Sequence, residues 1–334
     1  MNPFMRIKPI QDANKFIDMA FRRASKVEPS LPQKLPPLLK AKRREEARVR
    51  KVAQFLHDRF NNIVKQFPKI NDLHPFYRDL TDVLVGVDEL KKYLASLRGA
   101  ARVVMKIANE HIRNIRRATD PSEAARERRA AYGRIASFVK KLNERLIFLE
   151  EARSKLRKLP SIDPDMPTIV VAGPPNVGKS TLVRVVSTAK PEIATYPFTT
   201  KMLILGHFKA DSKTYQILDT PGLLDRPLSE RNQIELQAIM ALRHVANIIV
   251  FMVDPSETCG YSLDMQLSIY EDIKKSFNVP IIPTINKVDI SLPEMIEKAK
   301  RVVGDDAIEM AAIKGVGVSD LIEKFRSFLE RESS

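Results

Sequence analysis

A glycine-rich segment is the first part of the chain whose residue types and spacing could do chemistry. Residues 173–180 read Gly-Pro-Pro-Asn-Val-Gly-Lys-Ser and fit the phosphate-binding pattern G-x-x-x-x-G-K-[ST]. An apolar run, 168–171, precedes the segment, and a helical pattern follows it. The backbone N–H groups of such a turn and the N-terminus of the next helix point at anionic oxygens. We therefore expect nucleotide binding at Gly173, Pro175, Asn176, Val177, Gly178, Lys179, Ser180 and Thr181.

Two side chains of this loop have separate roles in the prediction. Lys179 should reach the β- and γ-phosphates as a mobile positive charge. Ser180 should give its hydroxyl to Mg²⁺. A chance match in an ordinary strand–helix turn is the alternative interpretation of the loop taken alone.

The turn Asp219-Thr220-Pro221-Gly222 follows a predicted strand at 214–219 and is the second group of interest. A carboxylate at a strand end, here Asp219, can hold Mg²⁺ either directly or through water. The N–H of Gly222 can donate to a γ-phosphate, so its position can depend on whether that phosphate is present. Taken alone, these four residues could equally form an ordinary turn.

The segment Asn286-Lys287-Val288-Asp289 follows a third apolar strand and indicates recognition of guanine. Guanine presents its N1–H and its N2 amino group side by side, so one carboxylate, Asp289, can accept both hydrogen bonds. Adenine offers neither donor there and would leave a buried charge unpaired. We expect Asn286 to tie this loop to the base and the Lys287 stem to cover the base plane. The three motifs in this order favour a guanine-nucleotide switch over an ATP-using kinase.

The N-terminal half of the chain has the pattern of long helices. Apolar residues recur every three or four positions from Leu80 to Ile115, which predicts one long helix. Asp120-Pro121-Ser122-Glu123 then has the residues of an N-cap and capping box, and predicts a second long helix reaching about residue 158. Helices near 11–26 and 38–66 precede them, so an antiparallel bundle is expected.

After the proline-rich linker 159–167 the pattern changes to strands that alternate with helices. This alternation predicts a mostly parallel sheet with helices on both faces. The expected fold class is therefore an all-α helical domain over 1–160 followed by an α/β Ras-like P-loop G domain over 161–334. The predicted strands cover 168–172, 202–208, 214–219, 247–253, 280–285 and 306–311, and the predicted helices 179–188, 231–245, 262–277, 292–302 and 317–331.

The 334 residues carry a formal net charge of +15, and the excess is confined to the first half. Residues 1–160 contain 37 Lys and Arg against 18 Asp and Glu, whereas residues 161–334 carry a formal charge of −4. Such asymmetry suggests a polyanionic partner, either nucleic acid or an anionic membrane surface. Charged helical faces that only keep the domain in solution are the alternative.

The positive charge of the long predicted helix falls into a stripe beside its apolar residues. Five basic residues at spacings of four and seven could follow a phosphate backbone, which would make binding steeply salt-dependent. Because aromatic residues are few and tryptophan is absent, structured RNA suits the composition better than single strands. A solvated face with intrahelical ion pairs is the alternative. The predicted RNA contacts are Arg98, Arg102, Lys106, Arg113 and Arg117.

The nucleotide motifs resemble those of the TRAFAC GTPases, and the segment Tyr196-Pro197-Phe198-Thr199-Thr200 resembles the Obg-related branch. The order of basic helices, linker and G domain, with the opening Met5-Arg6-Ile7-Lys8-Pro9-Ile10, is similar to archaeal members of the nucleolar GTP-binding protein family. That family is associated with assembly of the large ribosomal subunit. The resemblance implies GTP and GDP as ligands, the large ribosomal subunit or its rRNA as partner, and Mg²⁺ as cofactor.

The resemblance also implies further site residues. Thr200, with Thr199 as the alternative, would meet Mg²⁺ and the γ-phosphate, so that Lys179, Thr200 and Gly222 form the catalytic set. Ser180, Thr200 and Asp219 would hold the Mg²⁺ ion. In the loop Ala311-Ala312-Ile313, a backbone N–H would meet guanine O6, with alanine at 311 in place of the usual serine.

One departure from Ras-like enzymes bears on the rate of hydrolysis. The residue after Gly222 is Leu223, which cannot orient the attacking water as a glutamine does. We expect slow intrinsic hydrolysis that needs a partner, a rearranged loop or an ion. In related GTPases an asparagine at the place of Asn176 helps to hold K⁺, which makes Asn176 a candidate K⁺ ligand. An asparagine that only stabilises the turn is the alternative.

Three further expectations follow from composition. The one cysteine, Cys259, excludes an internal disulfide and fits a reducing compartment, so a cytoplasmic protein is expected. The strongly apolar run Ile248 to Val253 is too short to span a bilayer, and no stable membrane association is expected. A monomer is favoured.

Two alternative functions remain open at this point. One is a scaffold that binds nucleotide without hydrolysing it, and the other is a GTPase bound to membranes by its basic helices.

Overall fold

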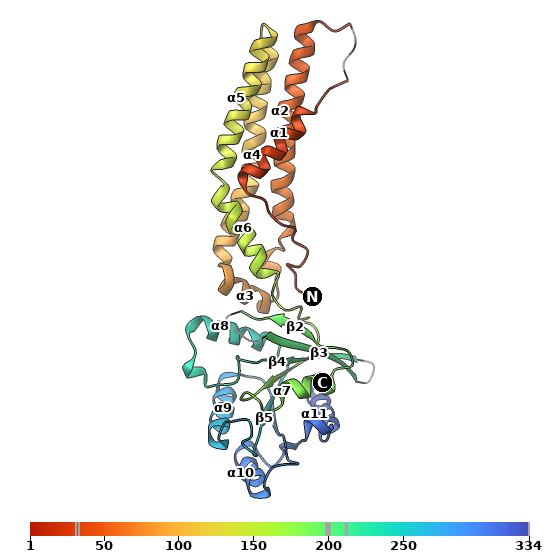
Figure 1. The fold of residues 1–334 in the computed structure, drawn as a ribbon, viewed down its shortest axis with the longest axis vertical. Helices are drawn as coiled ribbons and strands as arrows, with labels where there is room; N and C mark the ends of the chain where they lie inside the picture. The colour runs from red at the N-terminus through yellow and green to blue at the C-terminus, as the bar shows by residue number, and fades with distance from the viewer. Residues whose placement is uncertain (31, 33, 198–201, 211–212, 333–334) are drawn as a thin grey trace. The chain divides into compact units, whose positions relative to one another are not determined.

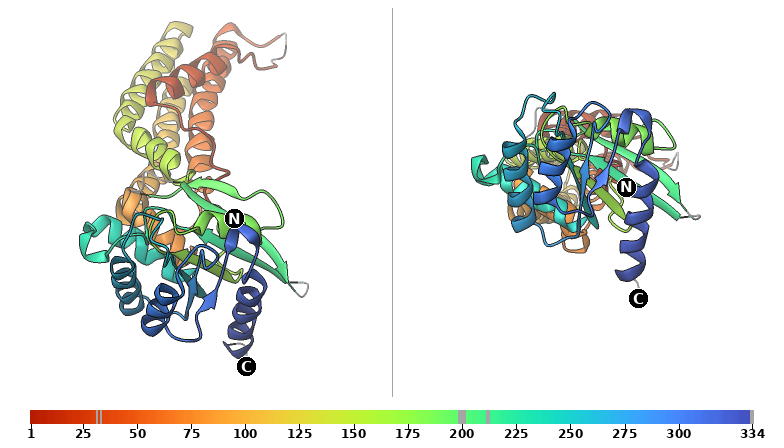
Figure 2. Two further views of the ribbon diagram at one scale, coloured as in Figure 1. Left: turned by 60° about the horizontal axis from the view of Figure 1, so that its bottom comes forward. Right: turned by 90° about the horizontal axis from the view of Figure 1, so that it is seen from below.

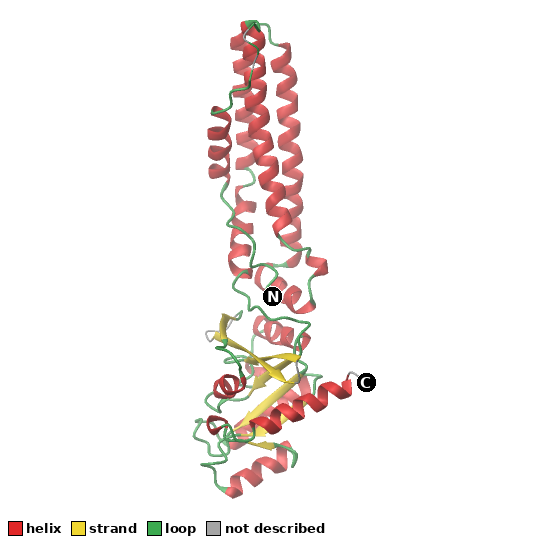
Figure 3. Ribbon diagram, turned by 90° about the vertical axis from the view of Figure 1, so that its right-hand side faces the viewer, coloured by secondary structure: helices red, strands yellow, loops and turns green. Residues whose placement is uncertain are grey.

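The computed structural model describes the chain except residues 31, 33, 198–201, 211–212 and 333–334. The chain forms two compact units, which we call the helical unit and the mixed unit. The helical unit comprises Pro3–Asp72 and Val85–Arg157, and the mixed unit comprises Met1–Asn2, Leu73–Leu84 and Lys158–Ser334. Figure 3 distinguishes them by secondary structure, because all strands drawn belong to the mixed unit. The predicted fold class, a helical bundle followed by an α/β fold, is confirmed.

The helical unit is an elongated bundle (Figure 1). Its helices pack along their lengths, α2 against α4 and α5, and α1 against α2. Large apolar side chains, such as Leu56, Phe60 and Leu97, are fully buried between them. The described helices are α1 (Ala13–Ser25), α2 (Pro37–Gln66), the short 3₁₀ helix η1 (Ile70–Asp72), α4 (Val87–Arg117), α5 (Pro121–Lys140) and α6 (Asn143–Leu156).

The apolar pattern that predicted one helix from Leu80 to Ile115 covers two helices. Gly86, with φ at +75°, separates α3 (Pro75–Val85) from α4. A left-handed residue cannot continue a right-handed helix, and glycine adopts this conformation without steric cost. α3 belongs to the mixed unit, where the Tyr77 hydroxyl donates to the carbonyls of Pro160 and Ile162 at 3.0 and 2.7 Å. The mixed unit therefore includes a segment from the N-terminal half, so one boundary near residue 160 does not separate the two units.

The second long helix predicted from residue 121 is also divided. α5 ends at Lys140 and α6 begins at Asn143, with Lys141 and Leu142 between them. Both intervening residues keep right-handed helical dihedrals. Because those dihedrals nearly preserve the helical phase, the apolar stripe continues across the break, and the pattern could not reveal it. At the start of α5, the Asp120 carboxylate accepts from the N–H groups of Ser122 and Glu123, as its capping residues predict.

The sheet of the mixed unit has the strand order β2-β3-β4-β1-β5-β6-β7. Neighbours from β4 to β7 are parallel, whereas β3 is antiparallel to both β2 and β4. The short edge strand β2 has no counterpart in the sequence prediction. The strands are β1 (Thr168–Ala172), β2 (Glu192–Thr195), β3 (Met202–Ala210), β4 (Lys213–Asp219), β5 (Ile248–Val253), β6 (Ile281–Ile285) and β7 (Ile308–Glu309).

Helices cover both faces of this sheet, as Figure 2 shows. Alternate residues of the central strands pack with α7 and α11 on one face, where Leu182 and Phe325 are fully buried. On the other face, Phe251 of β5 packs against Tyr270 of α9 with ring centroids 5.3 Å apart. The helices of this unit are α3, α7 (Lys179–Val186), α8 (Gln233–Ala241), α9 (Leu263–Ser276), α10 (Pro293–Val303) and α11 (Val318–Glu332), with 3₁₀ turns η2 (Leu228–Glu230), η3 (Leu242–His244) and η4 (Ala312–Lys314).

The central strands β1, β5 and β6 are parallel, so their carboxyl ends meet at one edge of the sheet. The predicted nucleotide motifs follow β1, β4 and β6, and therefore lie near this edge. This is the position where open α/β sheets bind ligands. In the part of the chain that the structure describes, we find no helix long and apolar enough to cross a membrane.

Candidate functional site

Two glycines determine the shape of the loop between β1 and α7. Gly173 has φ at +132°, and a Cβ built on it would lie 2.5 Å from the Met252 carbonyl oxygen. Gly178 has φ at +110°, and its Cβ would lie 2.3 Å from Nδ2 of Asn286. Both positions combine a backbone conformation that favours glycine with a close approach of neighbouring atoms. The phosphate loop is thus packed directly against the strand ends beside it.

The side chain of Lys179 is held inside the loop. Its ammonium group donates to the carbonyls of Gly173 and Pro174 at 2.8 and 2.6 Å, and the residue is buried. Asn176 is left-handed, with φ at +62°, a conformation that asparagine tolerates better than most residues. The loop lines a cavity of about 350 Å³. The lining residues are Pro175, Asn176, Gly178, Lys179, Ser180, Thr181, Pro221 and Asp225.

The hydroxyl of Ser180, a residue that lines this cavity, lies against the buried carboxylate of Asp219, as a shared metal ion would require. Ser180 donates to Oδ2 of Asp219. The other oxygen, Oδ1, is buried and has no hydrogen-bond partner among the described residues. Burial raises the pKa of Asp219, against the lowering effects of Ser180 and Lys179. A buried, incompletely satisfied carboxylate beside a hydroxyl fits a hard cation such as Mg²⁺.

The turn after Asp219 is attached to β1 and to the phosphate loop by one hydrogen bond each. The Thr220 hydroxyl donates to the Val171 carbonyl at 2.8 Å, and the N–H of Gly173 donates to the Leu224 carbonyl at 3.0 Å. Leu223, the residue in place of a water-orienting glutamine, is buried with 2% of its surface exposed. Its side chain therefore contributes to the core and has no polar group to offer a water molecule.

An ion pair next to this turn was not predicted from the sequence. Asp225 and Arg231 are 2.8 Å apart and belong to no recognised motif. The carboxylate of Asp225 lines the phosphate cavity and accepts from the N–H of Gly222 at 2.9 Å. The sequence hinted at this ion pair only through its residue types, because an aspartate and an arginine stand six positions apart in a loop. Their proximity depends on how that loop folds.

Asn286 connects the guanine-recognition segment to both neighbouring loops. Its Nδ2 donates to the Val177 carbonyl of the phosphate loop at 2.8 Å. Its Oδ1 accepts from the N–H of Ala312 at 2.9 Å. The loop at Ala311 and Ile313 is thus joined through one side chain to the phosphate loop. We expected Asn286 to join its own loop to the base, and the structure shows it joining three loops of the protein.

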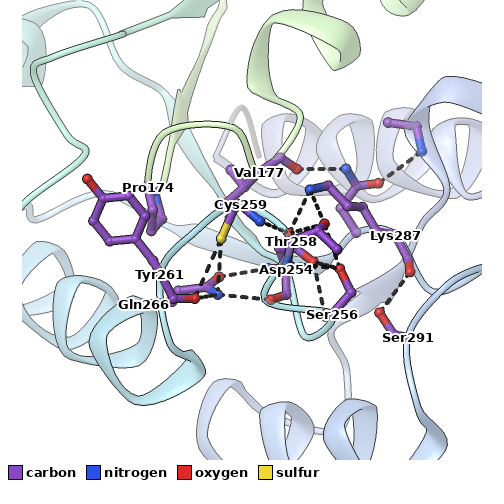
Figure 4. A network of polar contacts seen from close by, with 12 residues as sticks. Pro174, Val177, Asp254, Ser256, Thr258, Cys259, Tyr261, Gln266, Lys287 and Ser291 are labelled. Atoms are coloured by element: carbon purple, nitrogen blue, oxygen red, sulfur yellow. Dashed lines mark hydrogen bonds and ion pairs between the residues drawn. The ribbon is translucent and has the colours of Figure 1, made fainter.

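Lys287 is held by a polar network that centres on Asp254, at the carboxyl end of β5 (Figure 4). The ammonium of Lys287 lies 2.6 Å from Asp254 Oδ2 and 2.9 Å from the Thr258 hydroxyl. Asp254 is fully buried, and burial acts to raise its pKa. The hydrogen bonds from Lys287 and Ser256 outweigh burial, so the pKa lies below the ordinary value. Asp254 therefore orients the Lys287 stem, a role that the sequence did not suggest.

The network continues from Asp254 to the neighbouring loop and helix, as Figure 4 shows. Gln266 of α9 donates to the Asp254 carbonyl, and the N–H of Cys259 donates to the Asp254 carboxylate, both at 2.9 Å. Cys259 is buried here as a free thiol. These contacts fix the loop that follows β5 against the guanine-recognition segment.

The carboxylate of Asp289 lies beside a lysine. Its Oδ2 is 2.8 Å from Nζ of Lys314, which is 60% exposed. Lys314 lowers the pKa of Asp289, so the carboxylate is ionised at neutral pH. An exposed pair of this kind contributes little free energy and can rearrange readily. Asp289 can therefore offer a charged acceptor to a ligand.

Part of the remaining predicted segment can be placed. Tyr196 is buried and its hydroxyl donates to the Ala238 carbonyl of α8 at 2.7 Å. Thr199 and Thr200, for which we predicted a role at Mg²⁺ and the γ-phosphate, lie outside the described residues. The anchored tyrosine fixes the start of the segment against α8.

The five basic residues predicted to bind RNA lie on α4 of the helical unit, and all are exposed. At 100° per residue their spacings place them within an arc of about 100°. None of the five forms an ion pair with another described residue. The basic residues of α2 differ, since Arg44 and Arg48 pair with Glu45, and Arg50 pairs with Glu46. The α4 stripe (Arg98, Arg102, Lys106, Arg113 and Arg117) is therefore the less neutralised of the two basic surfaces.

Comparison with known proteins assigns both units to one group. The family model described as NOG1 N-terminal helical domain matches residues 4–163, and that described as Nucleolar GTP-binding protein 1 (NOG1) matches residues 233–289. An uncharacterized protein of Methanocaldococcus jannaschii is 41% identical over 89% of this chain and 83% of its own length. Nucleolar GTP-binding protein 1 of Drosophila melanogaster is 37% identical over 90% of this chain and 46% of its own length.

The chain spans about half of the length of the eukaryotic relatives it matches. A crystal structure described as nucleolar GTP-binding protein 1 of Plasmodium falciparum covers 52% of this chain, with 36% identity and a TM-score of 0.46. It aligns over 92% of its own length.

Proposed function

Because this chain belongs to the nucleolar GTP-binding protein 1 family, we propose that it binds GTP and GDP and hydrolyses GTP slowly, as a switch in assembly of the large ribosomal subunit. The observation that carries the nucleotide part is the double hydrogen bond of Asn286, to Val177 and to Ala312. Through it, the loop that can cradle phosphate and the loops that can read guanine form one connected site. Asp289 follows three residues later and supplies the acceptor for the two guanine donors.

Each residue of the site has one proposed task in hydrolysis. The Lys179 ammonium leaves the loop carbonyls to contact the β- and γ-phosphates. Ser180, Asp219 and Thr200 would hold Mg²⁺, which when bound neutralises charge that develops on the phosphate oxygens. The Gly222 N–H donates to the γ-phosphate and makes the following loop responsive to it. Val177, Thr181 and the Ala311–Ile313 backbone complete the nucleotide contacts.

Slow hydrolysis follows from the residue after Gly222. Leu223 is buried and apolar, so water is not oriented from this position. We propose Asn176 as a K⁺ ligand whose ion supplies positive charge at the phosphates. Single-turnover hydrolysis by the full chain should then be faster in K⁺ than in Na⁺ at equal ionic strength, and the difference should disappear in Asn176→Ala. Equal rates in the two salts would remove K⁺ from the mechanism.

The basic surface is the proposed contact with ribosomal RNA. The α4 stripe has five exposed basic side chains, none of which forms an ion pair with another described residue, and phosphate groups attract such an arrangement. We propose that the helical region docks on rRNA, while the region after the linker carries the nucleotide. The site of action proposed is the cytoplasm, and the protein is proposed to act as a monomer without stable membrane association.

Exchange of the base-recognising acid tests the nucleotide assignment. Asp289→Asn removes a charged acceptor for two guanine hydrogen bonds, and each such bond contributes about 1.5–3 kcal/mol. GTP affinity should fall by at least about tenfold. Xanthosine triphosphate, with a carbonyl in place of the amino group, should gain affinity because the introduced amide can donate to it. Equilibrium binding of fluorescent nucleotides measures both changes.

An aspartate outside the predicted site provides the matched control. Asp264 lies on α9 with 77% of its side chain exposed and pairs with Lys298, so Asp264→Asn changes the same charge at a residue without a predicted nucleotide contact. It should leave the affinities for both nucleotides unchanged. Wild-type protein that prefers ATP to GTP would refute the proposed function.

A further inference from the structure

The loop after Gly222 contains a buried ion pair to which the proposed function assigns no role. The side chain of Arg231 is 3% exposed and that of Asp225 is 9% exposed. Arg231 Nη2 lies 2.8 Å from Asp225 Oδ1. A buried ion pair is weak evidence for stability, because removing two charges from water costs about as much as their attraction returns. The pair is therefore a candidate for a role in ligand specificity.

Both backbone polar groups of Gly222 are held by this pair. The N–H of Gly222 donates to Asp225 Oδ2 at 2.9 Å. The carbonyl of Gly222 accepts from Arg231 Nη1 at 2.7 Å, and the next carbonyl, of Leu223, accepts from Arg231 Nη2 at 2.9 Å. The glycine that should sense the γ-phosphate is thus fixed on both sides.

The acceptor that Gly222 uses here is itself an anion in a phosphate cavity. Asp225 lines the same cavity as Lys179 and Ser180. A carboxylate oxygen that accepts from a backbone N–H has the charge and hydrogen-bonding character of a phosphate oxygen. One N–H cannot make a strong, linear hydrogen bond to two acceptors at once. The Asp225 carboxylate and a γ-phosphate therefore compete for this donor.

We propose that Asp225 and Arg231 are positioning residues that set the preference of this site for nucleoside triphosphate over diphosphate. This inference rests on the proposed function. The Asp225 carboxylate takes the Gly222 hydrogen bond when the nucleotide ends at its β-phosphate. A triphosphate must displace that carboxylate and free the Gly222 carbonyl from Arg231. The pair thus lowers triphosphate affinity and leaves diphosphate affinity unchanged.

The backbone of Gly222 is suited to such a rearrangement. Its φ is +79°, in the left-handed region where glycine has no steric penalty. A glycine can leave this conformation by rotation of its own dihedrals, whereas the neighbouring Leu223 and Leu224 are buried. The first step of the backbone rearrangement that a triphosphate requires can therefore be confined to the peptide groups around Gly222.

Neutralising the carboxylate tests the inference. In the 334-residue chain with Asp225→Asn, the Gly222 N–H meets an uncharged acceptor, and a neutral hydrogen bond is roughly half as strong as a charge-assisted one. We expect affinity for a non-hydrolysable GTP analogue to rise about fivefold or more, with GDP affinity changed less than about twofold. The readout is the ratio of the two dissociation constants, measured with fluorescent nucleotides in excess Mg²⁺.

A double variant covers the case in which an unpaired, buried Arg231 prevents folding. Asp225→Asn with Arg231→Gln removes both charges and retains the approximate shape of both side chains. It should shift the ratio in the same direction. Asp264→Asn and Arg226→Lys are the matched controls, since Arg226 is a half-exposed arginine five positions away that pairs with Glu235. Both controls should keep the wild-type ratio.

Several outcomes would overturn the inference or the function on which it rests. Equal changes in the affinities for diphosphate and triphosphate, in the folded single or double variant, would indicate a purely structural pair. Loss of triphosphate binding alone would identify Asp225 as a ligand on the triphosphate side instead of a competitor. Wild-type protein that binds neither guanine nucleotide would refute the proposed function itself, whereas an unchanged ratio with intact GDP binding refutes only this inference.

Discussion

At the scale of single residues, the site depends on side chains that join loops to one another. Asn286 bonds to the phosphate loop and to Ala312, Asp254 holds Lys287, and Asp225 holds Gly222. Each of these contacts is made inside the protein and orients a neighbour that is proposed to touch nucleotide. Substitutions at the joining residues should therefore affect binding through geometry.

Gly178→Ala tests the tightest of these contacts. The added methyl group would lie 2.3 Å from Nδ2 of Asn286, and the backbone has φ at +110°. Asn286 must move, which breaks its bond to the phosphate loop. We expect a loss of about 2–4 kcal/mol in the free energy of unfolding of the mixed unit and at least about a tenfold loss of GDP affinity. Chemical denaturation and nucleotide titration measure the two effects.

Gly133→Ala is the control for a glycine-to-alanine exchange. Gly133 lies within α5, and a Cβ there meets no atom within 4 Å. Alanine should stabilise that helix by about 0.5–1 kcal/mol and leave nucleotide binding unchanged. Normal nucleotide affinity in Gly178→Ala would show that the Asn286 contact does not shape the phosphate loop.

At the scale of elements, the breaks between helices and the ends of strands determine which surfaces and motifs each segment presents. Gly86 assigns α3 to the mixed unit and leaves α4 to begin at Val87. α4 then presents an apolar side to α2 and α5 and an exposed basic stripe. The parallel strands bring the nucleotide motifs together, because each motif begins where a strand ends.

The α4 stripe should carry much of the affinity for RNA. Charge reversal by Arg98→Glu, Arg102→Glu and Lys106→Glu replaces three attractive phosphate contacts with repulsive charges. Binding to large-subunit rRNA should weaken by at least about tenfold. The slope of the logarithm of the binding constant against the logarithm of salt concentration should become shallower by about one for each lost contact. Electrophoretic mobility shifts at several salt concentrations give both quantities.

A matched reversal on another helix controls for net charge. Arg126, Arg129 and Lys140 of α5 are also exposed, and their replacement by Glu changes the total charge by the same amount. If both triple variants lose the same affinity, the attraction is non-specific and α4 has no special role.

At the scale of the whole molecule, the two kinds of surface suggest that nucleotide state and RNA binding are linked. Residues 1–160 carry the positive excess and residues 161–334 carry the proposed nucleotide site. If GTP and rRNA favour the same conformation of the protein, each must raise the affinity for the other by the same factor.

Co-sedimentation with large ribosomal subunits tests this linkage. The full chain should bind the subunits more tightly with a non-hydrolysable GTP analogue than with GDP, by about fivefold or more if the coupling is at least 1 kcal/mol. Liposomes with anionic lipid, sedimented in parallel, should retain little protein at physiological salt. Equal binding to subunits in both nucleotide states would separate the RNA role from the switch.

The sequence alone determined the fold class, most strand and helix positions, and the residues proposed to contact nucleotide. Local patterns suffice for these features, because a strand, a glycine-rich turn and a helix that follow one another in the chain are one continuous structure. Periodicity also located the basic stripe of α4. It could not locate the break between α5 and α6, since the turn there preserves helical phase. Gly86 does not preserve that phase, but apolar residues keep a spacing of three or four positions across it, so their spacing did not reveal this break either.

Only the tertiary structure decided which residues position the residues that are proposed to contact nucleotide. Asp254 and Lys287 are 33 positions apart, and Gly178 and Asn286 are 108 apart, so only the packing of neighbouring strand ends brings them into contact. Asp225 and Arg231 are close in sequence, yet their meeting at Gly222 depends on an irregular loop that has no periodic pattern. The sequence specifies which residue types stand at the motif positions. The hydrogen-bond partners that position those residues are determined by the folded chain, because they come from other segments or from an irregular loop.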